Sequence, residues 1–116
     1  MKNLKQRISS TMKQLVTWLV AGDYDAIEKY TGGVRLSANL ISVAIFEYGH
    51  KLVMPPTDIF ENLYTVEVIG ASPRKWHVEI NWWTEGDGRS DWTLECTFID
   101  SQESLLKAEV DNLHML

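Results

Sequence analysis

The feature that most constrains the fold is an alternation of apolar and polar residues on both sides of the segment Gly86-Asp87-Gly88. Apolar residues recur at every second position in two runs, which are Trp76, Val78, Ile80, Trp82 and Trp92, Leu94, Cys96, Phe98. Successive side chains of a β-strand point to opposite faces, so this period is typical of a strand with one buried face. The two runs therefore predict a hairpin of antiparallel strands that share one apolar face.

The register of this hairpin follows from the requirement that its apolar residues face one another. A three-residue loop at Gly86-Asp87-Gly88 meets that requirement. This loop places Glu85 opposite Arg89 and Trp82 opposite Trp92. The other predicted pairs are Ile80 with Leu94, Val78 with Cys96 and Trp76 with Phe98.

Shorter alternating runs predict one further strand before this hairpin and one after it. The first run contains Val66 and Val68, which are predicted to pair with Val78 and Trp76. The last run contains Leu106, Ala108 and Val110, which are predicted to pair with Phe98, Cys96 and Leu94. Short loops join all four strands, so we expect an antiparallel meander.

The N-terminal part of the chain has the period of a helix instead. Apolar residues at spacings of four and three fall on one helical face, and they are Leu4, Ile8, Met12, Leu15 and Leu19. Gly22 is predicted to end this helix. Asp23 is predicted to cap a second helix over residues 24–30.

A third helix is predicted between Ser37 as its N-cap and Gly49 as its end. Its expected apolar face contains Leu40, Ile41, Ala44, Ile45 and Tyr48. Residues 57–63 are expected to add one more helical turn. We therefore predict an α+β fold, in which residues 1–116 form one domain with three N-terminal helices packed on one face of a four-stranded antiparallel sheet.

Composition and charge narrow the class of protein. The chain has one cysteine, so it forms no intramolecular disulfide, and it shows no signal peptide or membrane-spanning run. We therefore expect a cytoplasmic protein without a membrane partner. The net charge is −5, and residues 63–116 alone carry ten acidic and four basic residues, a net charge of −6. This charge disfavours binding to nucleic-acid phosphates; a solvated surface is its default meaning, and a basic protein as partner is the alternative.

The segment Ala21-Gly22-Asp23-Tyr24-Asp25-Ala26-Ile27 resembles the opening of NTF2-like (cystatin-like) domains. The order of helices followed by a meander fits that family over most of the chain. The resemblance implies a pocket between helices and sheet, which five aromatic residues would line: Tyr30, Tyr48, Trp76, Trp82 and Trp92. Aromatic packing in a filled core is the alternative that we prefer.

A second resemblance rests on the segment Gly88-Arg89-Ser90-Asp91-Trp92-Thr93-Leu94-Glu95 and on the ending Asp111-Asn112-Leu113-His114-Met115-Leu116. Both are similar to a family of short bacterial proteins of unknown function, although Asp87 lengthens the turn beyond the family's pattern. The family supplies no activity to transfer. Small acidic proteins of this kind often act as immunity partners of bacterial toxins, which is an association only.

The polar face of the predicted sheet carries the candidate binding site. The predicted registers place Glu79 opposite Glu95 and Glu95 opposite Glu109, a row of three like charges. Directly opposed like charges are destabilising. A solvated outer face is the interpretation that the row alone favours, because exposed charges are strongly screened, and the functional alternatives are a docking patch for a basic partner and a carboxylate metal site.

Four more residues are predicted on this face: His77, Glu67, Trp83 and Asp91. His77 shares it with Glu79 and is expected opposite Glu67, an arrangement for which we favour a surface ion pair over a transition-metal site. Trp83 is expected beside Asp91, either as an aromatic anchor for a partner or covered by a loop or a symmetric partner. Cys96 is predicted to be buried and unreactive, since it lies on the apolar face.

Motifs of nucleotide-binding loops, zinc proteases and serine hydrolases are absent from the sequence. We therefore expect no catalytic residue, no cofactor and no metal. The predicted function is that of a non-enzymatic binding protein, such as an immunity-type partner of a basic protein. The alternative is an NTF2-like small-molecule binder or enzyme with a pocket between helices and sheet. The oligomeric state stays open, and a homodimer is among the options.

Overall fold

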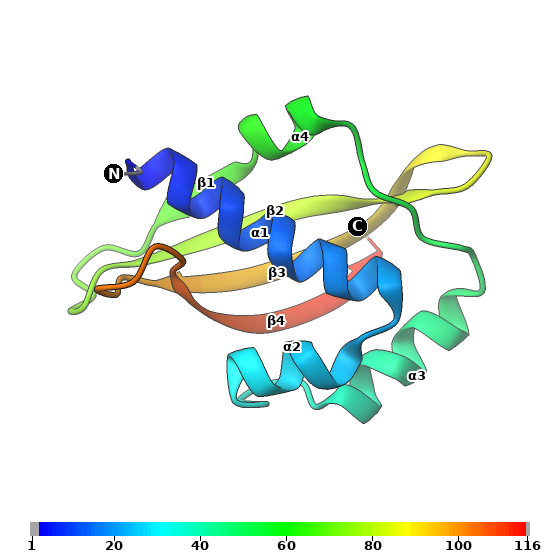
Figure 1. The fold of residues 1–116 in the computed structure, drawn as a ribbon, viewed down its shortest axis with the longest axis horizontal. Helices are drawn as coiled ribbons and strands as arrows, with labels where there is room; N and C mark the ends of the chain where they lie inside the picture. The colour runs from blue at the N-terminus through cyan, green and yellow to red at the C-terminus, as the bar shows by residue number, and fades with distance from the viewer. Residues whose placement is uncertain (1–2, 116) are drawn as a thin grey trace.

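Over residues 3–115, which the structure describes, the computed structural model has four helices followed by four strands (Figure 1). Side chains are described for residues 3–113. The helices are α1 Leu4–Ala21, α2 Tyr24–Thr31, α3 Ala38–Tyr48 and α4 Thr57–Glu61. The strands are β1 Tyr64–Glu67, β2 Lys75–Thr84, β3 Gly88–Ile99 and β4 Lys107–Met115.

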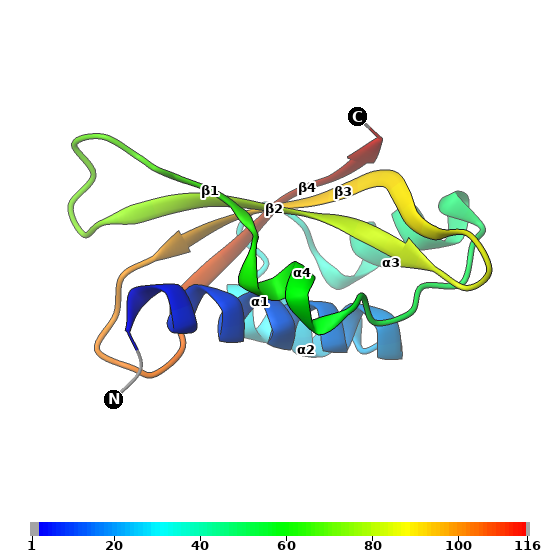
Figure 2. The same cartoon turned by 90° about the horizontal axis from the view of Figure 1, so that it is seen from above.

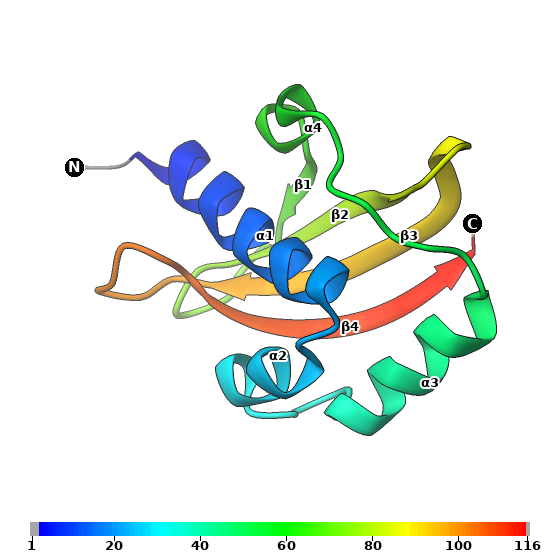
Figure 3. The same cartoon turned by 45° about the vertical axis from the view of Figure 1, so that its right-hand side comes forward.

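The strands form one antiparallel sheet in the order β1-β2-β3-β4, which confirms the predicted α+β meander. Helices α1, α2 and α4 lie on one side of this sheet (Figure 2). We call the face that they cover the inner face and the opposite one the outer face. Strands β3 and β4 are long and curved, and α3 lies beyond α2 (Figure 3).

The helices begin and end where local chemistry favours it. Asn3 and Gln6 form a reciprocal capping box, in which each side chain accepts a hydrogen bond from the other's backbone N–H at 2.9 and 3.0 Å. The predicted caps Asp23 and Ser37 accept hydrogen bonds from Ala26 and Leu40. Gly22 ends α1 with a φ of 76°, a left-handed conformation that only glycine adopts without strain.

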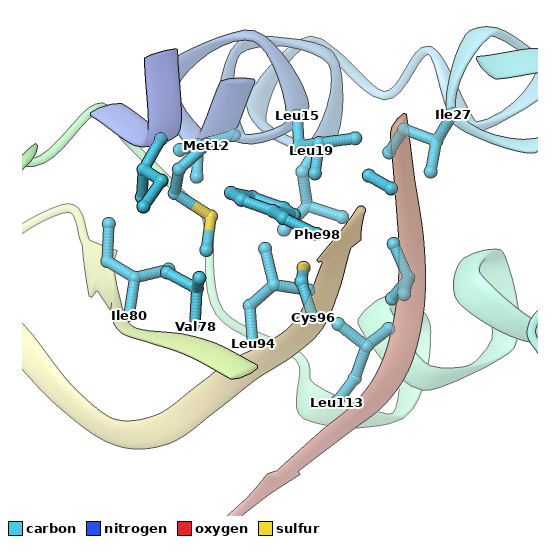
Figure 4. Close-up of a cluster of buried hydrophobic side chains, with 14 of the residues drawn as sticks. Met12, Leu15, Leu19, Ile27, Val78, Ile80, Leu94, Cys96, Phe98 and Leu113 are labelled. Atoms are coloured by element: carbon cyan, nitrogen blue, oxygen red, sulfur yellow. The ribbon is translucent and has the colours of Figure 1, made fainter. Parts of the chain in front are cut away.

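The core lies between α1 and the inner face, and its side chains fill that space (Figure 4). Met12 of α1 and the strand residues Val78, Cys96 and Phe98 are each 0% exposed. Two small interior cavities, both bordered by Leu19, have volumes of only ≈10 Å³ each. Such a space holds about one water molecule, so the aromatic and aliphatic core is filled.

The contacts of α3 correct the predicted apolar face of that helix. Ile41 is 1% exposed, whereas its neighbour Leu40 is 51% exposed. Ala44, Ile45 and Tyr48 are partly buried against the core. The sequence analysis had placed Leu40 on the buried side. Because α3 packs chiefly against α2 and reaches the sheet through Tyr48, whose ring contacts Trp82 and Trp92, only a narrow stripe of it is covered.

The central hairpin confirms the predicted pairs Trp76–Phe98, Val78–Cys96 and Ile80–Leu94. The turn differs, because Thr84 pairs with Gly88 and Trp83 pairs with Arg89, so the loop is residues 85–87. The predicted opposition of Glu85 and Arg89 is therefore wrong. A bulge in β3 absorbs the difference, and the rings of Trp82 and Trp92 still meet with centroids 5.2 Å apart.

The first hairpin is shifted by one residue from the prediction. Val66 pairs with His77, and Glu67 pairs with Trp76 instead of facing His77. A shift of one residue exchanges the two faces of a strand, so Val66 lies on the outer face and is 46% exposed. The physical reason is that β1 is a short, exposed edge strand with no core to fix its phase. Arg74 binds Glu67 through two hydrogen bonds of 2.8 Å and stacks over Trp76.

The last hairpin is shifted by two residues. Phe98 pairs with Ala108 and Cys96 with Val110, so the faces are kept although the predicted partners are wrong. Beyond a bulge, Leu94 pairs with Leu113. The predicted pairing of Phe98 with Leu106 fails because Leu106 belongs to the preceding loop, where its side chain is 0% exposed.

Helix α1 holds that loop in place through two side chains. Arg7 donates to Asp100 at 3.2 Å and to the carbonyl oxygens of Ser101 and Glu103 at 2.8 and 2.9 Å. Thr11, which is 0% exposed, accepts a hydrogen bond of 3.0 Å from the Leu106 backbone N–H. The loop is thus fixed by contacts from the other end of the chain, which a local pattern does not reveal.

Candidate functional site on the outer face of the sheet

The candidate site is built from the outward-pointing residues of the two central strands. Alternation along β2 buries every second side chain and leaves the intervening ones partly exposed on the outer face. Pairing with β3 then sets partners side by side, and Glu79 lies directly opposite Glu95. Because both strands are central in the sheet, this arrangement rests on a rigid support.

Three of the predicted residues come together there, and we call them the His77 cluster: His77, Glu79 and Glu95. The His77 Nε2 atom lies 3.0 Å from Oε2 of Glu79 and 3.4 Å from Oε1 of Glu95. The three side chains are 32%, 22% and 20% exposed, so the cluster is half-buried but open to solvent. The imidazole therefore lies against two carboxylates whose mutual repulsion a cation would relieve.

A groove of ≈440 Å³ lies next to the His77 cluster and shares Glu79 with it. We call it the outer groove; its other lining residues are Ile59, Asn62, Leu63, Tyr64, Ile80, Asn81, Trp83, Arg89 and Thr93. Tyr64 is 62% exposed, and Trp83 is partly exposed. The Asn81 amide donates to the Ser90 carbonyl oxygen at 3.0 Å, which fixes that side chain. The groove thus combines two accessible aromatic rings with the Glu79 carboxylate and the Arg89 guanidinium.

Glu109 is not part of the His77 cluster, which corrects the predicted row of three glutamates. Its partner across the sheet is Thr97, and its carboxylate lies 3.6 Å from Arg35. Arg35 Nε also lies 2.8 Å from Oδ1 of Asp111, so the two side chains form an ion pair. The angle at the Arg35 N–H is too sharp for this contact to count as a hydrogen bond. Thr97 donates to the other Asp111 oxygen at 2.6 Å. The charge of Glu109 is therefore offset within the chain.

Asp91 and Trp83 are not neighbours in the way that the sequence analysis predicted. The β3 bulge moves Asp91 out of register, and Arg89 takes the place opposite Trp83. Asp91 is exposed. Of the six predicted binding residues, His77, Glu79, Glu95 and Trp83 thus lie in or beside one continuous site, whereas Asp91 and Glu109 lie outside it.

Sequence reasoning missed four residues of this region: Tyr64, Asn81, Arg89 and Thr93. Asn81 lies two residues after Glu79, and Thr93 lies two residues before Glu95. Both therefore share the polar face with these glutamates, and the alternation of the sequence indicated their position. Tyr64 and Arg89 depended on the phase of β1 and on the β3 bulge, which the pattern did not show.

A larger concavity lies elsewhere, in an open groove of ≈720 Å³ between α2 and the edge of β4. Trp18 and Tyr30 contribute aromatic walls. The Tyr30 hydroxyl donates to the Leu106 carbonyl oxygen, and burial, followed by the charge of Glu103, raises the pKa of this phenol. The Thr31 hydroxyl likewise donates to a backbone carbonyl oxygen. Since these polar groups already have partners, this groove offers a ligand mainly apolar contact.

Comparisons with known proteins add one match. A family model described as a domain of unknown function (DUF7668) matches residues 16–116. No curated protein and no solved structure matches. The NTF2-like and bacterial assignments therefore stay predictions. Among the described residues, no helix has the length and apolar character needed to cross a membrane.

Proposed function

Because the match covers most of its length, the chain belongs to the DUF7668 family of domains of unknown function, and we propose that it is a non-enzymatic binding protein whose outer sheet face docks a basic protein segment. The observation that carries this proposal is the contrast between the two faces. The core between α1 and the inner face contains cavities of only ≈10 Å³, too small for an enclosed small-molecule site of about 300–1,000 Å³, and the grooves of ≈720 and ≈440 Å³ are open at the surface. The outer face instead presents carboxylates and aromatic rings to solvent.

The outer groove has the chemistry that recognises a lysine or arginine side chain. Tyr64 and Trp83 offer ring faces for a cation, and Glu79 offers a carboxylate at the same groove. Arginine in particular forms paired hydrogen bonds with carboxylates and stacks on aromatic rings. A basic side chain of a partner would therefore gain both kinds of contact at once.

The two opposed glutamates would act mainly on the rate of encounter. Negative potential at Glu79 and Glu95 attracts a basic segment over distances of about 8–10 Å at moderate salt. Glu109 contributes less, since Arg35 already lies beside it. A basic toxin neutralised by this chain in the bacterial cytoplasm would be one partner of this kind.

A small-molecule binder is the second candidate, and the ≈720 Å³ groove beside α2 and β4 is the observation that favours it. Trp18 and Tyr30 would supply its contacts. Soaking the protein with a mixture of apolar fragments and following these two rings by NMR tests this candidate. Shifts confined to the outer face would count against it.

The main proposal is tested with a hexa-arginine peptide titrated into the protein by calorimetry in the presence of a chelator. We expect saturable binding that weakens with salt. Trp83→Ala should lower the affinity by about 30-fold, the effect of losing a 2 kcal/mol anchor. Glu79→Gln should lower the affinity severalfold, chiefly through slower association.

The matched control is Glu109→Gln, which removes the same charge on the same face but outside the outer groove. Its affinity should stay within a factor of about two of the wild type, because Arg35 already offsets that carboxylate. Equal losses from Glu79→Gln and Glu109→Gln would show that only overall charge matters. That outcome would refute docking in the outer groove.

A further inference from the structure

We propose that His77, Glu79 and Glu95 form a binding site for a divalent transition-metal ion, with zinc as the best-fitting ion. This inference goes beyond the proposed docking function and does not depend on it, since the site is complete within one chain. The sequence alone had favoured an ion pair between His77 and Glu79. The measured arrangement of three side chains provides the new argument.

The first step of the argument is the spacing of the ligand atoms. Zinc binds imidazole nitrogen and carboxylate oxygen at about 2.0–2.2 Å in tetrahedral sites, which places neighbouring ligand atoms about 3.3–3.6 Å apart. In this structure Nε2 of His77 lies 3.0 Å from a Glu79 oxygen and 3.4 Å from a Glu95 oxygen. One ligand atom from each of the three residues lies within 4.8 Å of the others. Small side-chain rotations would bring all three around one ion.

The second step is that both carboxylates approach the same nitrogen atom. A single N–H makes one well-aligned hydrogen bond, and here Nε2 makes it with Glu79. An imidazole that served only as a cation between two glutamates would use both of its nitrogen atoms more effectively. Two carboxylate oxygens and one imidazole nitrogen at this spacing can instead bind one ion that accepts an electron pair from each.

The third step is the rigidity and chemistry of the donor set. Glu79 and Glu95 are direct partners across the two central strands, and His77 lies two residues from Glu79 on the same face, so the backbone fixes all three. One imidazole with two carboxylates suits zinc and neighbouring transition metals better than calcium or magnesium, which prefer oxygen ligands. Cys96, the one thiol of the chain, is buried on the inner face and does not contribute.

The site would also interact with the proposed function. Its ligands are 20–32% exposed, so the remaining coordination position faces solvent. A bound divalent ion would offset the charges of Glu79 and Glu95, the two glutamates that would attract a basic segment. Zinc and the hexa-arginine peptide should therefore compete for this face.

The experiment is a calorimetric titration of the full chain alone with Zn²⁺. We expect one ion per chain, with the affinity reduced at least tenfold in His77→Ala and in Glu95→Gln, because even indirect changes around metal ligands cost about 10–100-fold. His50→Ala is the matched control, since this exposed histidine lies outside the cluster. Its affinity should equal that of the wild type.

A second measurement keeps the test independent of variants that fold poorly. Co²⁺ added to the wild type should give the visible absorption of a tetrahedral site without a thiolate band, and Zn²⁺ should displace it. The ring signals of His77 should shift in step with the titration. Absence of stoichiometric binding, or binding that survives His77→Ala, would overturn the proposed site. If either result were obtained while the hexa-arginine peptide still bound in the presence of chelator, the metal site would be refuted and the docking function would be retained.

Discussion

Replacing Thr11 with valine should destabilise the protein by removing one buried hydroxyl. Thr11 is 0% exposed; it donates to the Arg7 carbonyl oxygen at 2.7 Å and accepts from the Leu106 N–H at 3.0 Å. Valine has nearly the same shape, so packing is retained while the Leu106 N–H is left buried without its acceptor. Such an unsatisfied group costs about 1–3 kcal/mol.

The net change in the free energy of unfolding also includes a stabilising contribution. The valine methyl group that replaces the hydroxyl adds roughly 0.8 kcal/mol of apolar burial. The free energy of unfolding should therefore fall by about 0.2–2.2 kcal/mol. An unfolding entropy of about 2.1 cal/mol/K per residue over 116 residues makes 1 kcal/mol equal to about 4 °C. The melting temperature should accordingly fall by about 1–9 °C.

The chain contains a matched control on the same helix. Thr17 also donates its hydroxyl to the carbonyl oxygen four residues earlier, at 2.7 Å, but its side chain is exposed. Thr17→Val should change the stability by less than about 0.5 kcal/mol. Urea unfolding followed by tryptophan fluorescence measures both variants, and hydrogen exchange reports on the Leu106 amide. Equal stability of the two variants, with unchanged exchange at Leu106, would refute the argument.

Two further predictions test the core and the position of α3. Cys96 should react slowly with a thiol reagent in the native protein and quickly in urea. Burial, followed by the charges of Asp111 and Glu95, raises the pKa of this thiol well above its ordinary value. The neutral thiol is thus favoured by folding, so stability should fall as the pH rises past about 8.5, and less so in Cys96→Ala. Ile41→Ala should cost about 2–4 kcal/mol in urea unfolding, whereas Leu40→Ala should cost less than about 0.5 kcal/mol; the reverse order would contradict the orientation of α3.

Local chemistry made much of the fold predictable from the sequence. The caps at Asp23 and Ser37 and the glycine ends of the helices were correct, because each depends on one side chain or one φ angle. The pairs from Trp76–Phe98 to Ile80–Leu94 were correct because a slip of one residue would expose tryptophan. The opposition of Glu79 and Glu95 followed from the same register.

The remaining errors in strand partners and in the charged row have physical causes that the periodicity of apolar residues does not reveal. Bulges in β3 and between β3 and β4 shift partners without changing the run of apolar residues. The phase of β1 was wrong because neither face of that strand is buried. Arg35 reaches Asp111 and Glu109 from a loop between helices, so its effect on the charged row depends on tertiary contact.

The contacts of α1 with the β3–β4 loop have a consequence for how the chain folds during synthesis. Thr11 and Leu106 are separated by 95 residues, and Arg7 and Glu103 by 96. Ribosomes add about 5–20 residues each second, so α1 is made about 5–20 s before the loop that it holds. During that interval its apolar face lacks the complete sheet that later covers it, since β4 follows Leu106 in the chain. A ribosome-bound chain stalled before Leu106 should therefore keep α1 accessible to proteases and chaperones, and the helix should become protected only after the last hairpin has emerged.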